Sequence, residues 1–317
     1  MSKSKILVTG AAGFIGSNLV EKLLLRKYDV IGVDNFNDYY DPKIKEENII
    51  SVLKKHNFKL YREDILNLNK LERIFRNEKI DVIVHLAARA GVRPSINKPK
   101  LYAKVNVLGT VNLLKLSVDY KVKRFIFGSS SSVYGNSKQL PFSESDPCDQ
   151  IISPYGASKR SAEFFVESFH KSFDLNCTIL RFFTVYGPRS RPDMAPAIFT
   201  KKIFNGETIQ QYGDGLSSRD YTFVDDITNG IVLSLEKESG FEVINLGNNH
   251  PIVISDFIKM IEYVTGKKTK IIKLSKCAGD MENTWADIKK ANRLLGWKPE
   301  TDLKEGLKRY ILWLRAN

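Results

Sequence analysis

The sequence predicts an α/β protein in which a doubly wound parallel sheet is joined to a smaller α/β domain. Three observations support this fold class. Apolar runs alternate with helical patterns, several runs end in small or acidic residues, and a glycine-rich turn joins the first run to the first helix. We expect a Rossmann-type sheet over residues 1–183 and the smaller domain over 184–317, with segments around 219–246 that can return to the first.

The first unit is a strand, a turn and a helix. Lys5–Thr9 is a continuous apolar run, as expected of a strand buried on both faces. Gly10, Gly13 and Gly16 follow it, and a helical pattern comes next. Glycines at these places allow a tight turn and let the backbone approach a pyrophosphate at the N-terminus of the helix. This context predicts a dinucleotide site, although the spacing differs from the commoner Gly-x-Gly-x-x-Gly.

An acidic residue closes the second expected strand. Asp29–Val33 is followed by Asp34, which stands 18 residues after Gly16. A carboxylate at this place accepts hydrogen bonds from the ribose hydroxyls of adenosine and repels a 2′-phosphate. The sequence therefore predicts NAD rather than NADP as the cofactor.

Strands and helices continue to alternate along the chain. Further strands are expected at 58–61, 81–86, 124–127 and 177–183, and helices at 68–76, from Pro99 onward and at 303–314. Small or polar residues follow three of these strands, at Asp64-Ile65, Ala87-Ala88 and Ser129–Ser132. Because the carboxyl ends of parallel strands share one edge of a sheet, we expect these residues to gather at one ligand site.

A tyrosine and a lysine in one expected helix are the candidate chemical groups. Tyr155 and Lys159 are four residues apart, which places both side chains on one face. An ammonium beside a phenol favours the phenolate, so Tyr155 would act as a base below its ordinary pKa of about 10. Such a base removes the proton of an alcohol while a hydride leaves the same carbon. We expect Ser130, at the end of a strand, to complete the catalytic set.

Composition argues against several other classes of protein. The net charge is +13, but the lysines are spread along the chain without a dense block, and we expect no nucleic-acid partner. No apolar run approaches the roughly 18 residues of a spanning helix, so we expect no membrane partner. Residues 1–5 lead directly into a strand pattern without room for a signal peptide, and three scattered cysteines favour the cytoplasm. Neither they nor the four histidines form a metal-ligand cluster.

Five stretches carry a resemblance to a known family, namely Val8–Gly16, Asp34–Tyr40, Ala87–Arg93, Tyr155–Lys159 and Arg181–Arg189. Along nearly its whole length the chain resembles the extended short-chain dehydrogenase/reductase family, and within it the nucleotide-sugar 4-epimerases. The resemblance implies NAD-dependent 4-epimerisation of a UDP-sugar through a 4-keto intermediate, with UDP-glucuronate to UDP-galacturonate as the expected conversion. The alternatives are a 4-epimerase for UDP-glucose or UDP-N-acetylglucosamine and, more distantly, an NAD-sensing protein without catalysis.

The resemblance assigns roles residue by residue. For the cofactor it implies Gly10, Gly13, Phe14, Ile15 and Gly16 at the pyrophosphate, Asp34, Asn35 and Asn37 at the adenosine ribose, Asp64 and Ile65 at the adenine, Leu86, Ala87, Ala88, Asn106 and Phe182 along the channel, and Tyr155 and Lys159 at the nicotinamide end. For the substrate it implies Tyr212, Arg219 and Asp280 at the uridine diphosphate. One position departs from the pattern: Cys277 stands where some glucose-type epimerases carry an arginine, so this diphosphate contact is missing unless Lys276 replaces it.

Positions 131 and 132 separate the reactions of this family. The 4,6-dehydratases resemble one another in an Asp-Glu pair there, and the decarboxylases that form UDP-xylose carry a glutamate at the second position. This chain has Ser131 and Ser132, without a titratable group, so the reaction is expected to stop at the ketone and reverse. We expect Ser131, Ser132 and Thr184 to hold the substrate carboxylate, with Arg191 or Arg93 supplying charge.

The resemblance also implies a homodimer. The helices around 101–118 and 161–173 would form its interface, and Phe164, Phe165 and Phe169 on the second of them would lie either in this interface or in the core.

Overall fold

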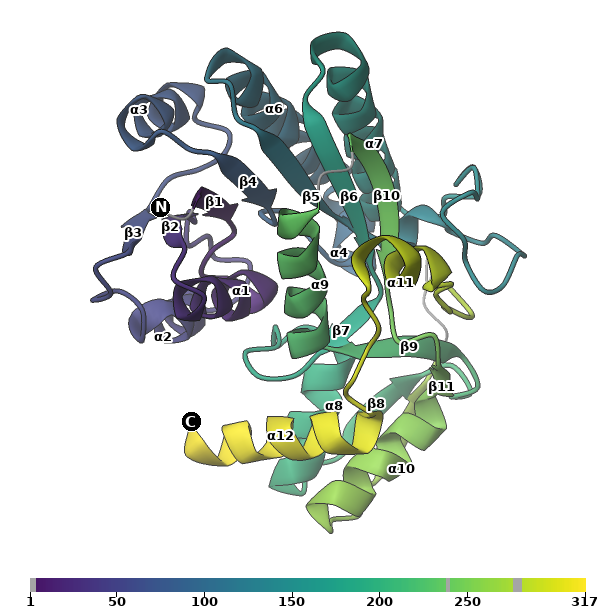
Figure 1. Ribbon diagram of the computed structural model, residues 1–317. Coiled ribbons are helices and arrows are strands. Elements are labelled where there is room, and N and C mark those ends of the chain that lie inside the picture. The colour runs from purple at the N-terminus through teal and green to yellow at the C-terminus, as the bar shows by residue number, and fades with distance from the viewer. Residues whose placement is uncertain (1–3, 238–239, 276–280) are drawn as a thin grey trace.

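The computed structural model describes residues 4–237, 240–275 and 281–317, and its centre is a parallel sheet (Figure 1). In spatial order, the seven strands that the described residues give this sheet are β10 (Phe241–Leu246), β6 (Asn176–Phe182), β5 (Arg124–Ser130), β4 (Val82–His85), β1 (Lys5–Thr9), β2 (Asp29–Val33) and β3 (Phe58–Tyr61). All neighbouring strands run parallel. The chain winds outward in both directions from β1, so the strand order reverses between β1 and β4, where such sheets open a ligand crevice.

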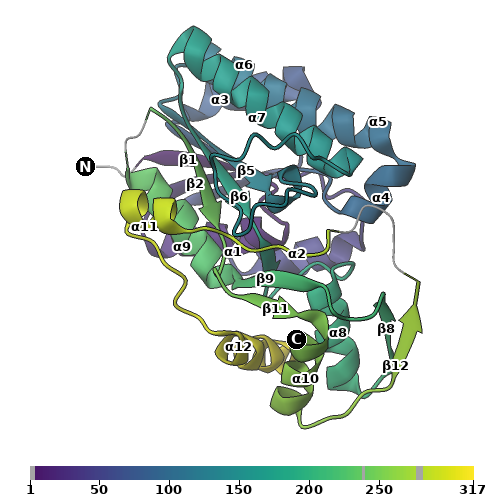
Figure 2. The ribbon, with the colours of Figure 1, turned by 90° about the vertical axis from the view of Figure 1, so that its right-hand side faces the viewer.

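Helices cover both faces of this sheet (Figure 2). One face is covered by α1 (Phe14–Leu25), α2 (Pro42–Ile50) and α9 (Val224–Glu236), and the other by α3 (Leu68–Glu78), α6 (Gly109–Asp119) and α7 (Pro154–Phe173). Strand β1 shows how the sequence specifies both layers. Ile6 and Val8 belong to the core beneath the first group of helices, whereas Leu7 belongs to the core beneath the second. Its continuous apolar run is therefore buried on both faces, as predicted.

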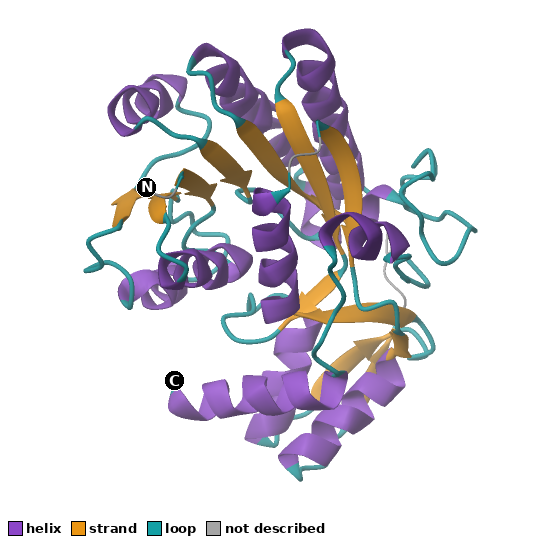
Figure 3. Cartoon of the chain, viewed as in Figure 1, coloured by secondary structure: helices purple, strands orange, loops and turns teal. Residues whose placement is uncertain are grey.

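A second, smaller set of strands and helices lies below the large sheet in Figure 3. Its three-stranded sheet has the order β11 (Pro251–Val253), β9 (Ser218–Phe223), β7 (Thr184–Tyr186), and its two-stranded sheet pairs β12 (Ile271–Leu274) with β8 (Ile209–Tyr212). The helices packed with them are α8 (Ala195–Asn205), α10 (Ile254–Thr265) and α12 (Leu303–Ala316). They share a core that includes Tyr186, Phe257 and Leu307.

The chain passes more than once between the two parts. After β7, β8 and β9 the chain returns to the large sheet through α9 and β10. Strand β10 pairs with β6 in a register that sets Phe241 opposite Cys177 and Leu246 opposite Phe182. Helix α11 (Lys289–Leu295) joins the same core as α9, where Trp297 Nε1 donates to the carbonyl oxygen of Asp226. The domain boundary between residues 183 and 184 stays a prediction. A division into two domains there has to count α9, β10 and α11 with the large sheet of the first domain.

The expected helix from Pro99 is in fact composite. It consists of α5 (Pro99–Tyr102), a π-helical segment η1 (Ala103–Leu108) and α6, and it is preceded by the short α4 (Val92–Asn97). A short 3₁₀ turn, η2 (Ser131–Val133), follows β5. No helix in the described parts of the chain is long and apolar enough to cross a membrane. In the same residues, no group of three or more His, Cys, Asp or Glu side chains is arranged to hold a metal ion.

Candidate active site

A cavity of about 480 Å³ runs along the carboxyl ends of the central strands. The predicted site residues that line it are Gly10, Gly13, Phe14, Ile15, Gly16, Asp34, Asn35, Asn37, Asp64, Ile65, Leu86, Ala87, Ala88, Ser130, Ser131, Ser132, Tyr155, Lys159, Phe182, Thr184, Arg191 and Arg219. Both parts of the molecule contribute, because Thr184, Arg191 and Arg219 follow or belong to the smaller sheets. Residues that are far apart in the sequence thus meet at the sheet edge where ligands were expected.

The glycine turn forms one end of this cavity. Gly10 has φ +69°, and its N–H donates to the carbonyl oxygen of Val33 over 2.8 Å. A Cβ atom at Gly10 would lie 2.9 Å from the backbone nitrogen of Ala87, and one at Gly16 would lie only 2.0 Å from the carbonyl oxygen of Gly10. The turn is therefore too compact for side chains, and the N-terminus of α1 faces the cavity behind Gly13. This cradle fits the pyrophosphate of a dinucleotide.

The acidic end of β2 is held in a defined orientation. The Asp34 carboxylate accepts the N–H of Ala12 over 3.1 Å and the N–H of Phe36 over 2.9 Å, and the Lys45 ammonium lies 3.7 Å away. Asn35 Nδ2 donates to Asp64 Oδ2 over 2.8 Å, which joins the ends of β2 and β3. Asp34, Asn35 and Asp64 all line the cavity, so side chains that bear oxygen atoms stand where ribose hydroxyls would bind.

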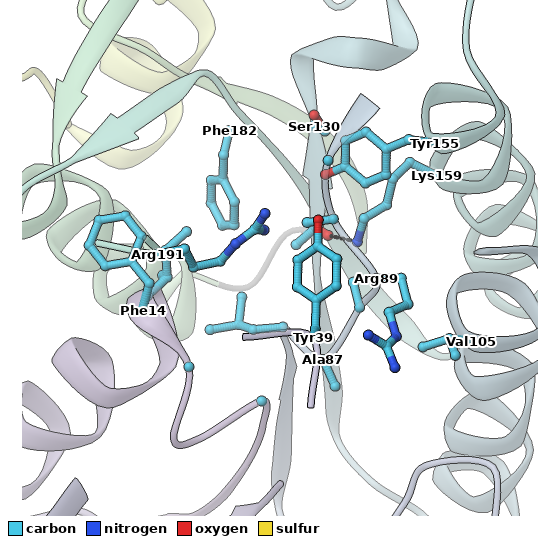
Figure 4. A pocket seen from close by; sticks show the side chains of 18 of the residues that line it. Phe14, Tyr39, Ala87, Arg89, Val105, Ser130, Tyr155, Lys159, Phe182 and Arg191 are labelled. Atoms are coloured by element: carbon cyan, nitrogen blue, oxygen red, sulfur yellow. Dashed lines mark hydrogen bonds between the residues drawn. The ribbon is translucent and has the colours of Figure 1, made fainter. Parts of the chain in front are cut away.

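The catalytic candidates come together at the other end of the cavity. Tyr155 and Lys159 project from α7 toward Ser130 at the end of β5 (Figure 4). Helix α7 begins there because Ser153 caps it, with its hydroxyl accepting the N–H of Gly156 over 3.1 Å. The predicted convergence of strand end and helix face is therefore present. Ser130 and Tyr155 are close enough that their hydrogen bond lowers the pKa of the phenol.

The electrostatics of Tyr155 differ from the prediction. Burial raises the pKa of its phenol, and the hydrogen bond of Ser130 and the charge of Arg191 offset this only in part. Lys159 was expected to lower that pKa, but its ammonium instead donates to the carbonyl oxygen of Gly128 over 2.7 Å. Burial also lowers the pKa of Lys159 to about 7, although Glu163 raises it. The expectation from spacing alone was wrong because it ignored the cost of burying both groups.

The remaining substrate candidates divide into two groups. Ser131 and Ser132 form the 3₁₀ turn after β5, where the Ser132 N–H donates to Ser130 Oγ over 3.1 Å, and both line the cavity with Thr184. Arg191 reaches the same space but is paired with Asp193, Nε to Oδ1 over 2.9 Å and Nη2 to Oδ2 over 2.6 Å. The serine and threonine hydroxyls are thus neutral donors beside a guanidinium whose charge is already shared.

Three predicted residues lie elsewhere. Asn106 does not line the cavity: its amide accepts the Arg89 N–H over 2.7 Å and donates to the Arg89 carbonyl oxygen over 2.9 Å, so it holds the wall from behind. Arg93 and Tyr212 also lie outside the lining, with the guanidinium 4.1 Å from the centre of the tyrosine ring. This contact joins α4 to β8 across the two parts. Asp280 lies outside the described residues, as do Lys276 and Cys277.

Several residues at the cavity received no role from the sequence. Tyr39 stands in the centre of Figure 4 between Arg89 and Arg191, and its hydroxyl donates to Asp193 Oδ2 over 3.2 Å. Both guanidiniums lie over its ring, at 5.3 and 5.2 Å from the centre. The position of Tyr39 and Arg89 shortly after the ends of β2 and β4 is the feature of the sequence that could have indicated a place at the cavity. For Lys45, on α2, the sequence offers no comparable signal.

Comparisons with known proteins agree with this geometry. The family described as GDP-mannose 4,6 dehydratase matches residues 7–310. A UDP-glucuronate 4-epimerase of Thermodesulfobacterium geofontis is 44% identical over 312 residues, which cover 98% of this chain and 96% of that protein. The crystal structure of a Bacillus cereus UDP-glucuronic acid 4-epimerase in complex with UDP-glucuronic acid and NAD is similar, with a TM-score of 0.93, 40% identity and coverage of 98% and 99%.

A neutral-sugar enzyme is also similar. The structure of a Thermotoga maritima UDP-glucose 4-epimerase with UDP-glucose has a TM-score of 0.90 and 36% identity, and the match covers 98% of this chain and 99% of that one. The fold and the length of these matches agree with the sequence resemblance over nearly the full chain. The chain therefore belongs to the extended short-chain dehydrogenase/reductase family, in the nucleotide-sugar group that the GDP-mannose 4,6 dehydratase family describes.

Proposed function

We propose that this chain catalyses the NAD-dependent 4-epimerisation of a UDP-sugar, most specifically of UDP-glucuronate to UDP-galacturonate. The observation that carries the proposal is that Ser130, Tyr155 and Lys159 meet in the same cavity as the glycine turn. The similar Bacillus cereus protein, whose structure contains UDP-glucuronic acid and NAD, supports both the cofactor and the substrate class.

The glycine turn and the residues that follow β2 and β3 would hold the cofactor, because they line the cavity. When bound, NAD supplies the acceptor for the hydride of sugar C4 and later returns that hydride to the opposite face. Tyr155 Oη takes the proton of the 4-hydroxyl and gives it back, and Ser130 Oγ hydrogen-bonds the same sugar oxygen. Burial raises the pKa of the phenol, and the positive charge of a bound nicotinamide would act against that rise.

The substrate preference rests on the neutral hydroxyls beside the catalytic set. Ser131, Ser132 and Thr184 can hydrogen-bond a carboxylate without like-charge repulsion, whereas an Asp-Glu pair at 131 and 132 would repel it. A uronic acid oxidised at C4 is a β-keto acid, which loses CO₂ when its carboxylate is free to rotate. Held by three hydroxyls, the carboxylate stays in an orientation that disfavours this loss. Arg219, on β9, would bind the diphosphate.

Two further expectations belong to the proposal. Phe164 and Phe165 are exposed on α7, as a homodimer interface on this helix requires, whereas Phe169 packs against the core. Arg160 partly covers this surface, with its guanidinium 4.1 Å from the centre of the Phe164 ring. The cytoplasmic location, predicted from the cysteines, stays a prediction.

The test is incubation of the purified protein with UDP-glucuronate, with and without added NAD, and identification of the product by NMR. The proposal expects UDP-galacturonate, and a Tyr155→Phe variant prepared in parallel shows whether a contaminating enzyme formed it. UDP-glucose and UDP-N-acetylglucosamine are tested alongside. Faster turnover of either neutral sugar would replace the uronate assignment, and no product from any of the three sugars would refute the epimerase itself.

A further inference from the structure

A buried carboxylate lies directly behind the catalytic set. Glu163 is on α7, four residues after Lys159 and eight after Tyr155, so the three side chains follow one face of the helix. Glu163 is 1% exposed and does not line the cavity. Its ion-pair partner Arg181, on β6, is 2% exposed. A charged pair buried this deeply is costly unless it is fully hydrogen-bonded.

The hydrogen bonds of Glu163 connect three elements of the active site. Its carboxylate accepts Ser129 Oγ over 2.6 Å, Arg181 Nε over 3.0 Å and Arg181 Nη2 over 2.7 Å. Arg160 Nη1 adds a fourth donor at 3.0 Å. Ser129 is the residue before Ser130 at the end of β5, and Arg181 precedes Phe182 at the end of β6. One side chain thus fixes α7 against the ends of both strands.

We propose that Glu163 is a positioning residue for the reaction, which holds the Ser129–Ser130 strand end and places a negative charge one helical turn from Lys159. The inference rests on the proposed function. Replacing a buried ion pair by apolar residues is often neutral for stability, so the fold alone does not explain a charge at this place. The position of the Glu163 charge, one helical turn from Lys159, does explain it.

The surroundings of Lys159 show why the charge matters. Its ammonium lies 4.7 Å from the centre of the Phe127 ring and donates to the Gly128 carbonyl oxygen, both on β5. His85, on β4, carries no compensating charge, because burial and Lys159 lower its pKa to about 3. On the neighbouring elements, Arg160 of α7 and Arg181 of β6 are positive, and both are bound to Glu163. Glu163 is the group whose charge raises the pKa of Lys159 against the effect of burial.

The charge of Glu163 affects the pH at which Lys159 loses its proton. Without the Glu163 charge, Lys159 loses its proton at lower pH, and two arginines next to it become uncompensated. Lys159 then loses its positive charge at the catalytic end of the cavity at the pH values where the enzyme should be active. The high-pH limb of the rate is therefore expected to move toward lower pH.

The experiment compares Glu163→Gln, which keeps the shape and removes the charge, with Glu163→Asp, which keeps the charge. Lysines are labelled with ¹³C at Cε, the Lys159 signal is assigned by its loss in Lys159→Met, and its titration is followed by NMR without substrate. In Glu163→Gln the midpoint is expected about one pH unit lower, and the high-pH limb of kcat is expected to shift with it. In Glu163→Asp both should stay near the wild-type values.

Ser129→Ala is the second control, because it removes one hydrogen bond of Glu163 and leaves the charge. It is expected to lower kcat without moving the Lys159 midpoint. If Glu163→Gln does not fold, the double variant Glu163→Gln/Arg181→Met is compared with Arg181→Met alone, because these two proteins differ only in the charge of Glu163, and the Lys159 midpoint is expected to be lower in the double variant. An unchanged Lys159 midpoint on removal of the Glu163 charge overturns the inference. Inactivity of the wild type on all UDP-sugars would refute the proposed function instead, and the titration would still decide the role of Glu163.

Discussion

Replacing Gly16 by alanine tests whether the glycine turn is the dinucleotide site. The Cβ atom would lie 2.0 Å from the carbonyl oxygen of Gly10 and 2.8 Å from its carbonyl carbon. Both are backbone atoms, so more than 1 Å of movement of the turn or of α1 is needed to restore an ordinary contact. Overpacking of this kind costs about 3 kcal/mol. If NAD requires the undistorted turn, the same energy corresponds to an affinity loss of about 100-fold.

Gly13 provides a graded comparison within the same turn. Its added Cβ atom would lie 3.2 Å from the same carbonyl oxygen, and its φ of −74° suits alanine. Gly13→Ala is therefore expected to lower NAD affinity by about tenfold or less, since a shift of a few tenths of an ångström relieves the contact. Gly206 is a control outside the site. It has φ +76° with no atom within 4 Å, so alanine there costs stability through backbone strain and should leave NAD affinity unchanged.

NAD affinity is measured by isothermal titration calorimetry and the free energy of unfolding by urea denaturation, for the wild type and all three variants. The expected order of NAD affinity is wild type and Gly206→Ala, then Gly13→Ala, then Gly16→Ala. Wild-type affinity in a folded Gly16→Ala protein would show that the cofactor does not bind at this turn.

Two further predictions concern the site, and a third concerns Asp220, a buried carboxylate on β9. Tyr155→Phe should lower kcat about 1,000-fold with an unchanged fold, because it removes the proton acceptor; steady-state kinetics and circular dichroism check this, and a loss below tenfold would assign the base elsewhere. Replacing Ser131 and Ser132 together by alanine should raise CO₂ release from UDP-glucuronate or abolish its turnover, and unchanged uronate kinetics would remove their carboxylate role. Burial raises the pKa of Asp220 to about 6, so the folded state binds this proton more tightly than the unfolded chain does. Its stabilising contribution is complete below about pH 4 and is lost as pH rises through about 6. Asp220→Asn should flatten that part of the stability profile in urea denaturation, and an unaltered slope between pH 4 and 7 would contradict it.

The residues that sequence reasoning placed well are those at strand ends. Gly10, Asp34 and Ser130 each follow or close a buried strand, and parallel strands bring such positions to one edge whatever the loops do. The helix pair Tyr155 and Lys159 was equally accessible because its spacing is local.

The residues that sequence reasoning missed depend on contacts between distant segments. Tyr39 meets Asp193 across 154 positions, and no local pattern in either loop predicts that contact. Asn106 was assigned to the channel, but the π-helical segment turns its amide to the Arg89 backbone instead. The pKa of Tyr155 was misjudged for a related reason, since burial depends on the packed structure and not on spacing.

The return of β10 to the large sheet has a consequence for fragments of this protein. A chain cut after residue 183 would keep β6 but lose the strand that covers its outer edge, together with α9, which packs on the same face as α1. The bare edge and the uncovered apolar face would favour pairing with other chains. The N-terminal portion is therefore unsuited to production as an isolated NAD-binding module. A rearranged chain whose new termini lie in an exposed loop, with β10 retained, would keep the sheet complete.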